Sequence, residues 1–106
     1  MQQYEQAVAD YTRSLALDPT LALAYNNRGV TYQALQRDDE AMADYTHAIE
    51  LDPTLATAYT NVGRVFGNQG RLHKALPYFE QAAHLGDSVA AQYAAQVQQM
   101  LGASFK

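Results

Sequence analysis

The sequence contains no cysteine, and only 7 of its 106 residues are lysine or arginine, against 11 aspartate or glutamate. Without cysteine the chain has no disulfide framework, thiolate metal site or cysteine nucleophile. The net charge of -4 argues against nucleic acid as a partner, because that binding depends on basic side chains that neutralise phosphates. No apolar run approaches the roughly 18 residues of a membrane span, and no signal peptide is visible. We therefore expect a cytoplasmic protein.

What the chain does contain is an internal repeat with a period of 34 residues. Residues 41–46 read AMADYT where residues 7–12 read AVADYT, and the segment LDPTLA occurs at both 17–22 and 51–56. A third, weaker copy keeps several small, aromatic and aliphatic residues in phase, namely Ala75, Ala82, Leu85, Ala90 and Tyr93. A repeat of this length indicates an array of supersecondary units that stack on one another.

The spacing within each copy is helical and no segment suggests a strand. Tyr25, Gly29 and Tyr32 fall on one helical face. Asp-Pro pairs should end a helix before Pro19 and Pro53, because the residue before proline is disfavoured in the helical region. Pro77 lies inside a predicted helix and should kink it mildly. The predicted helices span residues 3–17, 21–35, 38–51, 55–69, 72–85 and 88–101.

Capping residues are expected next to these helices. The hydroxyls of Thr20, Thr54 and Ser88 stand where an N-cap would open a helix. Asp38 and Asp39 should cap and charge the start of the third helix. In addition, Gly70 suits a left-handed C-cap.

Residues 22–55 resemble a tetratricopeptide repeat, a helical-hairpin family with small, aromatic and proline residues at fixed spacing. The matching residues are Tyr25, Gly29, Tyr32, Ala41, Tyr45, Ala48 and Pro53. Residues 56–89 match through Tyr59, Gly63, Phe66, Gly70, Ala75, Phe79 and Ala82, with Asp87 at the family's closing proline. Residues 4–21 match a second helix only, and 90–102 a C-terminal capping helix. The resemblance implies one domain over 1–106, an all-α right-handed solenoid of six antiparallel helices.

The ends of the chain suggest two further hypotheses. Arg28 and Asp44 are lost together in the next repeat, which predicts an ion pair, although Arg28 could instead reach Asp10. Asp10 occupies the position equivalent to Asp44, and its own arginine would precede the first residue. We therefore expect a segment of a longer array, the alternative being that Asp10 is an ordinary solvated residue. An uncovered face on the first helix, through Val8, Tyr11 and Leu15, would favour self-association with the last helix of another copy. The end of the last helix, residues 102–106, is expected to fray.

No constellation supports catalysis, a metal or a cofactor. His47, His73 and His84 lack the i, i+3 or i+4 spacing of ligand pairs and are expected to be surface residues. Asp38, Asp39 and Glu40 lack the alternating ligands of a calcium loop. No serine stands in a recognisable nucleophile motif. We expect a protein that is not an enzyme.

The family resemblance implies a concave groove lined by the first helix of each repeat. Arg64 is the cation on this face, which predicts contact with an acidic group of a ligand. Asn27 and Asn61 are equivalent amides that suit a peptide backbone. The predicted lining is Leu23, Asn26, Asn27, Val30, Gln33 and Ala34, then Thr57, Thr60, Asn61, Arg64 and Asn68, then Ala91, Ala94 and Gln98.

The predicted function is a protein–protein interaction scaffold that holds a peptide or partner helix in this groove, and the alternative is a self-assembling structural module. Some family members bind the C-terminal carboxylate of chaperones through a clamp of lysine, arginine and asparagine. This chain has Asn26, Val30, Asn61, Ala91 and Ala95 at the clamp positions, so only Asn61 agrees. We therefore expect no chaperone-tail clamp, and instead weak, weakly salt-dependent binding of a peptide with small or apolar side chains.

Overall fold

A computed structural model describes residues 2–103, and these residues form six α-helices and no strand. The helix bounds differ from the predicted ones by at most two residues, and the all-α class is confirmed. The helices are α1 Gln2–Leu17, α2 Ala22–Ala34, α3 Asp38–Leu51, α4 Ala56–Asn68, α5 Leu72–His84 and α6 Ser88–Ala103. None of the described helices is both long and apolar enough to cross a membrane.

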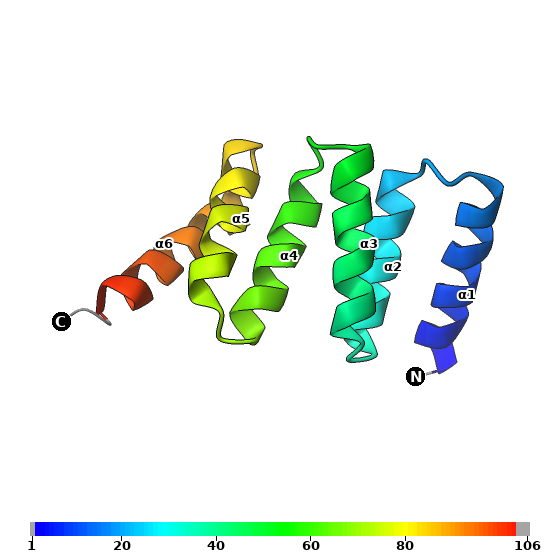
Figure 1. Ribbon diagram of the computed structural model, residues 1–106, viewed down its shortest axis with the longest axis horizontal. Coiled ribbons are helices and arrows are strands. Elements are labelled where there is room, and N and C mark those ends of the chain that lie inside the picture. The colour runs from blue at the N-terminus through cyan, green and yellow to red at the C-terminus, as the bar shows by residue number, and fades with distance from the viewer. Residues whose placement is uncertain (1, 104–106) are drawn as a thin grey trace. The chain divides into compact units, whose positions relative to one another are not determined.

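The chain divides into two compact units, residues 1–53 and 54–106. The first unit contains α1, α2 and α3, and the second contains α4, α5 and α6. Within each unit, helices that follow one another in sequence pack against each other and run in opposite directions (Figure 1). Such hairpins bury one face of each helix, as a helical repeat requires.

The helix ends follow the predicted proline and glycine signals. The first and third helices end at Leu17 and Leu51, directly before the Asp-Pro pairs. Gly70 has φ +75° after α4, which confirms the left-handed position. Its equivalent in the preceding repeat is Gln36, which takes φ +60° without being glycine.

The predicted N-caps at Thr20 and Thr54 are wrong. Each of the two helices concerned begins one residue later than expected, with Leu21 or Leu55 at the capping position and no side-chain cap. The hydroxyl of Thr20 instead donates to the Asp18 carboxylate at 2.6 Å, and the Thr20 backbone N–H donates to the same oxygen. The Asp-Pro-Thr turn therefore uses its hydroxyl within the turn rather than on the following helix.

Two other capping predictions also need correction. At the start of α6 the cap is Asp87, whose Oδ1 accepts the backbone N–H groups of Val89 and Ala90 at 3.0 and 3.2 Å, so Ser88 is the first helical residue. Before α3 the capping position is Arg37, which makes no side-chain cap. Asp38 lies inside the first turn with its acidic neighbours, where charge favours the helix N-terminus without capping it.

In the first unit the core is built around a glycine and a tyrosine. The ring of Tyr45 is fully buried and lies so near α2 that a Cβ on Gly29 would come within 2.6 Å of it. Next to this contact, Arg28 donates two hydrogen bonds to the Asp44 carboxylate, at 2.8 and 2.7 Å, which confirms the predicted ion pair. Arg28 also reaches α1, donating to the Thr12 hydroxyl at 3.2 Å rather than to Asp10.

The second unit repeats this packing without the ion pair. A Cβ on Gly63 would come within 2.6 Å of the Phe79 ring. Val62 is 1% exposed, and Tyr78 packs its ring against Tyr59 and Phe66, with centroids 6.4 and 5.7 Å away. Apolar side chains therefore occupy the two positions that hold Arg28 and Asp44 in the first unit. The fifth helix continues through Pro77 to His84.

Candidate functional site

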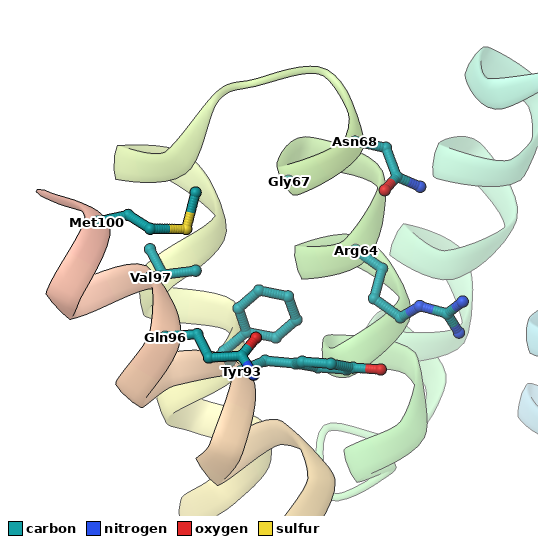
Figure 2. A pocket seen from close by; sticks show the side chains of 8 residues that line it. Arg64, Gly67, Asn68, Tyr93, Gln96, Val97 and Met100 are labelled. Carbon is teal, nitrogen blue, oxygen red and sulfur yellow. The ribbon is translucent and has the colours of Figure 1, made fainter.

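The second unit contains an open pocket of about 290 Å³ between its first and last helices. The lining residues come from all three helices of the unit (Figure 2). They are Arg64, Gly67 and Asn68 from α4, Phe79 from α5, and Tyr93, Gln96, Val97 and Met100 from α6. This volume lies just below the range of about 300–1,000 Å³ that is usual for small-molecule sites, so the pocket suits one or two side chains.

The pocket has a polar side and an apolar side. Figure 2 shows Arg64 and Asn68 on one side, and Val97 and Met100 on the opposite side. The Tyr93 hydroxyl extends in the same direction as the Arg64 guanidinium (Figure 2). A ligand that fills the pocket therefore meets charge at one end and methyl or thioether groups at the other.

The pocket exists because α6 docks on α5 through one apolar stripe. Ala90, Ala94 and Val97 recur at helical spacing and are buried in a cluster that includes Phe79. The Tyr93 ring adds a tilted contact to the Phe79 ring, with centroids 5.2 Å apart. The opposite stripe is polar and exposed, and it consists of Gln92, Gln96 and Gln99. Docking through the apolar stripe turns Gln96 and Met100 toward the pocket rim.

Asp87 holds the beginning of α6 in place. In addition to capping the helix, its Oδ2 accepts a hydrogen bond of 2.6 Å from the hydroxyl of Thr60 in α4. The Thr60 hydrogen bond, aided by the N–H groups of Ala90 and Val89 and opposed by burial, lowers the pKa of Asp87 from its ordinary value of 3.8. One carboxylate therefore ties the two helices that form the walls of the pocket.

Arg64 differs from the other arginines of the described chain in having no partner there. Arg13 and Arg37 approach Asp10 and Glu40 at 3.6 and 3.9 Å. Arg28 is paired with Asp44, which raises the pKa of the guanidinium further. The remaining one, Arg71, lies over the ring of Phe66, 5.3 Å from its centroid. Arg64 is exposed and makes neither an ion pair nor a ring contact with the described residues.

The predicted groove residues differ in how accessible they are. Leu23, Val30, Thr57, Arg64 and Asn68 are exposed, and Asn27 and Gln33 are half-buried. Gln33 accepts a hydrogen bond from the Tyr45 hydroxyl. Asn26, Thr60 and Asn61 are buried, at 3%, 7% and 6% exposure. Of the two equivalent amides, Asn27 is thus the more accessible one.

The groove residues predicted on the last helix do not line the pocket. Ala94 is buried in the apolar cluster, and Gln98 donates to Glu80 of α5 at 3.1 Å, so neither lines the pocket. Ala91 is exposed but does not line it either. The residues missed are Tyr93, Gln96, Val97 and Met100. Val97 and Gln96 belong to the apolar stripe and the glutamine stripe of α6, so the alternation of these stripes is a sequence signal for those two residues.

In the first unit, α2 exposes an apolar face of its own. Leu23 and Val30 are 56% and 46% exposed, and they are separated by two helical turns with the half-buried Asn27 between them. The residues expected to mediate self-association are less accessible. Leu15 is 6% exposed, and Val8 and Tyr11 are half-buried, because α1 packs against α2.

No group of three potential metal ligands occurs among the residues that the structure describes. His47, His73 and His84 are exposed, as expected for surface histidines. His47 is also stacked on Tyr25, with ring centroids 4.1 Å apart and an interplanar angle of 10°. This stacking gives His47 a packing role.

Comparison with known proteins identifies the class. Models described as tetratricopeptide repeat match residues 22–55 and 44–76, and one described as TPR repeat matches residues 1–36. The second TPR domain of human RPAP3, solved by NMR in complex with the HSP70 peptide SGPTIEEVD, is 32% identical with a TM-score of 0.80. That match covers 92% of this chain and 82% of the domain. The chain therefore belongs to the tetratricopeptide repeat family.

Two further solved structures share the fold. The first TPR of Spaghetti (RPAP3), bound to the HSP90 peptide SRMEEVD, is 23% identical with a TM-score of 0.86, covering 95% of this chain and 82% of that one. The crystal structure of MamA is 26% identical with a TM-score of 0.77, covering 84% of this chain and 52% of MamA. No curated protein sequence matches the chain significantly. These likenesses agree with an all-α helical-repeat solenoid fold.

Proposed function

We propose that the chain is a non-catalytic interaction scaffold that binds a peptide or a partner helix through the exposed faces of its first helices. The observation that carries this proposal is the pocket between α4 and α6, with an unpaired cation on one side and apolar groups on the other. Exposed side chains with convergent polar and apolar chemistry on rigid helices are typical of recognition surfaces.

The comparisons support a peptide as the class of ligand. The second TPR domain of RPAP3, at 32% identity, was solved with a bound HSP70 peptide. In the present chain, Leu23 and Val30 on α2 offer apolar contacts. Arg64 and Asn68 on α4 offer a charge and an amide. Each unit therefore exposes candidate contact residues of its own.

A chaperone-tail clamp of the kind based on several cations is not part of this proposal. Among the positions that such a clamp would use, Val30, Ala91 and Ala95 carry no charge. Asn26 and Asn61 are buried. A ligand carboxylate at those positions would therefore meet no compensating positive charge.

A random peptide display library tests the proposed function directly. We expect the folded chain to enrich related peptides, and we expect binding to be lost in a Leu23→Asp, Val30→Asp and Arg64→Ala variant. A matched control carries Thr46→Ala and His73→Ala, which change exposed residues on α3 and α5. Enrichment that is absent, or that survives in the first variant and fails in the control, would contradict the proposal.

Self-association through the terminal helices remains the alternative prediction. Its test is sedimentation equilibrium at high protein concentration, where the interaction-scaffold proposal expects a concentration-independent mass. An oligomer that persists when Leu23, Val30 and Arg64 are changed would favour the self-assembling module instead.

A further inference from the structure

We propose that the pocket between α4 and α6 is a subsite for an internal acidic residue of a peptide that is followed by an apolar residue. This inference rests on the proposed peptide-binding function and specifies the chemistry of the ligand. It is carried by three features of the pocket, which are its charge, its amide groups and its apolar end.

The charge argument begins with Arg64. Three other arginines of the described chain lie near a carboxylate and the fourth lies over an aromatic ring, so their charges are already compensated or engaged. Arg64 has no such partner among the described residues, and the pocket lining contains no aspartate or glutamate. A guanidinium pairs well with a carboxylate because its planar fork matches the two oxygens. An acidic side chain therefore complements this end of the pocket.

The amide groups favour an acidic residue within a peptide rather than a chain end. Asn68 and Gln96 line the pocket from opposite helices, and both side chains are exposed. Each amide can donate and accept, which matches the N–H and C=O of an internal peptide group. A terminal carboxylate only accepts hydrogen bonds, so it lacks the N–H donor that follows an internal carbonyl group.

The apolar end sets the identity of the neighbouring residue. Val97 and Met100 lie across the pocket from Arg64 (Figure 2). Methionine is unbranched and adapts its shape to a hydrophobic partner. Next to the acidic residue, a leucine-sized side chain would remove this apolar surface from water, which favours binding in proportion to the buried area.

A small series of acetylated and amidated peptides tests the subsite. The reference probe is Ala-Ala-Glu-Leu-Ala-Ala, and it is compared with Gln-Leu and Glu-Ala analogues and with Ala-Ala-Glu-Leu carrying a free terminal carboxylate. Binding is followed by NMR titration of the backbone amides. We expect the Glu-Leu probe to shift resonances of α4 and α6, with each single replacement weakening binding by roughly 3–10-fold.

Two variants that each remove one arginine test whether Arg64 is the source of the preference for an acidic residue. Arg64→Gln should abolish the preference for Glu-Leu over Gln-Leu, whereas Arg13→Gln removes an exposed arginine of α1 and should leave the preference intact. Equal binding of the Glu-Leu and Gln-Leu probes, a preference that survives in Arg64→Gln, or binding of the free-carboxylate peptide alone would overturn the subsite. So would the absence of any shift with the Glu-Leu probe. Enrichment of related peptides by the parent chain judges the proposed function separately, because that result makes no assumption about charge.

Discussion

Arg28 and Asp44 form a two-point ion pair between α2 and α3, with side chains that are only 17% and 6% exposed. At the equivalent positions of the second unit, Val62 is buried and Tyr78 packs against two aromatic rings. The same helix–helix contact is thus stabilised by charge in one repeat and by apolar packing in the next. This exchange leads to a direct test.

Asp44→Ala should lower the free energy of unfolding by about 2–4 kcal/mol, because it leaves the Arg28 charge in a largely buried place without its partner. The double variant Arg28→Val with Asp44→Tyr copies the second unit and should lie within about 1 kcal/mol of the parent chain. Urea unfolding followed by circular dichroism measures both. A double variant that loses at least as much stability as Asp44→Ala would contradict this interpretation.

Gly63 is required by its distance from Phe79 rather than by backbone conformation. Gly63→Ala should cost about 1–3 kcal/mol, because the new Cβ would lie 2.6 Å from a buried ring. Gly67→Ala, one turn later in the same helix, meets nothing within 4 Å and should gain up to about 1 kcal/mol from helix propensity. Thermal unfolding measures the melting temperatures of the two variants. Equal melting temperatures would refute the claim that the contact with Phe79 requires glycine at position 63.

The carboxylate of Asp87 should make the docking of α6 sensitive to acid. Its pKa in the folded chain is below the ordinary value of 3.8, chiefly because Thr60 donates to it. The stabilisation is therefore fully present above the ordinary pKa and is lost as the pH falls through the lower, folded pKa. Asp87→Asn keeps a capping side chain without the titrating charge.

We expect the parent chain to have a higher melting temperature than Asp87→Asn near neutral pH. The difference between the two melting temperatures should narrow below about pH 4. Other carboxylates, including Asp18, are shared by both chains, so the difference isolates Asp87. Melting curves collected between neutral pH and pH 2.5 provide the measurement. A difference in melting temperature that stays constant or widens in acid would contradict this mechanism.

Leu15 and Leu17 are two residues apart on α1 but have opposite environments, at 6% and 85% exposure. Leu15→Ala should cost about 2–4 kcal/mol as a core truncation, and Leu17→Ala should change stability by less than about 0.5 kcal/mol. Chemical denaturation gives both values, and sedimentation shows whether either variant changes the association state. If Leu15→Ala dissociated an oligomer and left stability intact, the self-association alternative would gain the support it now lacks.

The repeat pattern was sufficient to predict the helices, because proline and glycine punctuate each copy. It also predicted the Arg28–Asp44 pair, because both residues are lost together in the next copy, but it left Arg28–Asp10 open as an alternative. It failed at the helix N-caps. Thr20 bonds within its own turn, a choice between local partners that spacing does not decide. Asp87 caps α6 and also accepts a hydrogen bond from Thr60, which is distant in sequence.

The predicted groove and the pocket share residues only on α4. Position within the repeat placed Arg64 and Asn68 in the predicted groove, and both line the pocket. The same rule placed Ala91, Ala94 and Gln98 of α6 in the groove, and none of them lines the pocket. This helix packs through Ala90, Ala94 and Val97, and Val97 occupies the register of Gly29 and Gly63. A helix that docks through a different stripe shows different residues to the site, and the repeat register does not contain that information.

The central claim is that the pocket between α4 and α6 receives part of a peptide ligand, and amide chemical-shift mapping with a display-selected peptide tests it most directly. We predict that the largest shifts fall on Arg64, Asn68 and Gln96, and that they are reduced in Arg64→Gln. Shifts confined to the outer faces of α3 and α5, around Thr46 and His73, with none in the pocket would contradict the account.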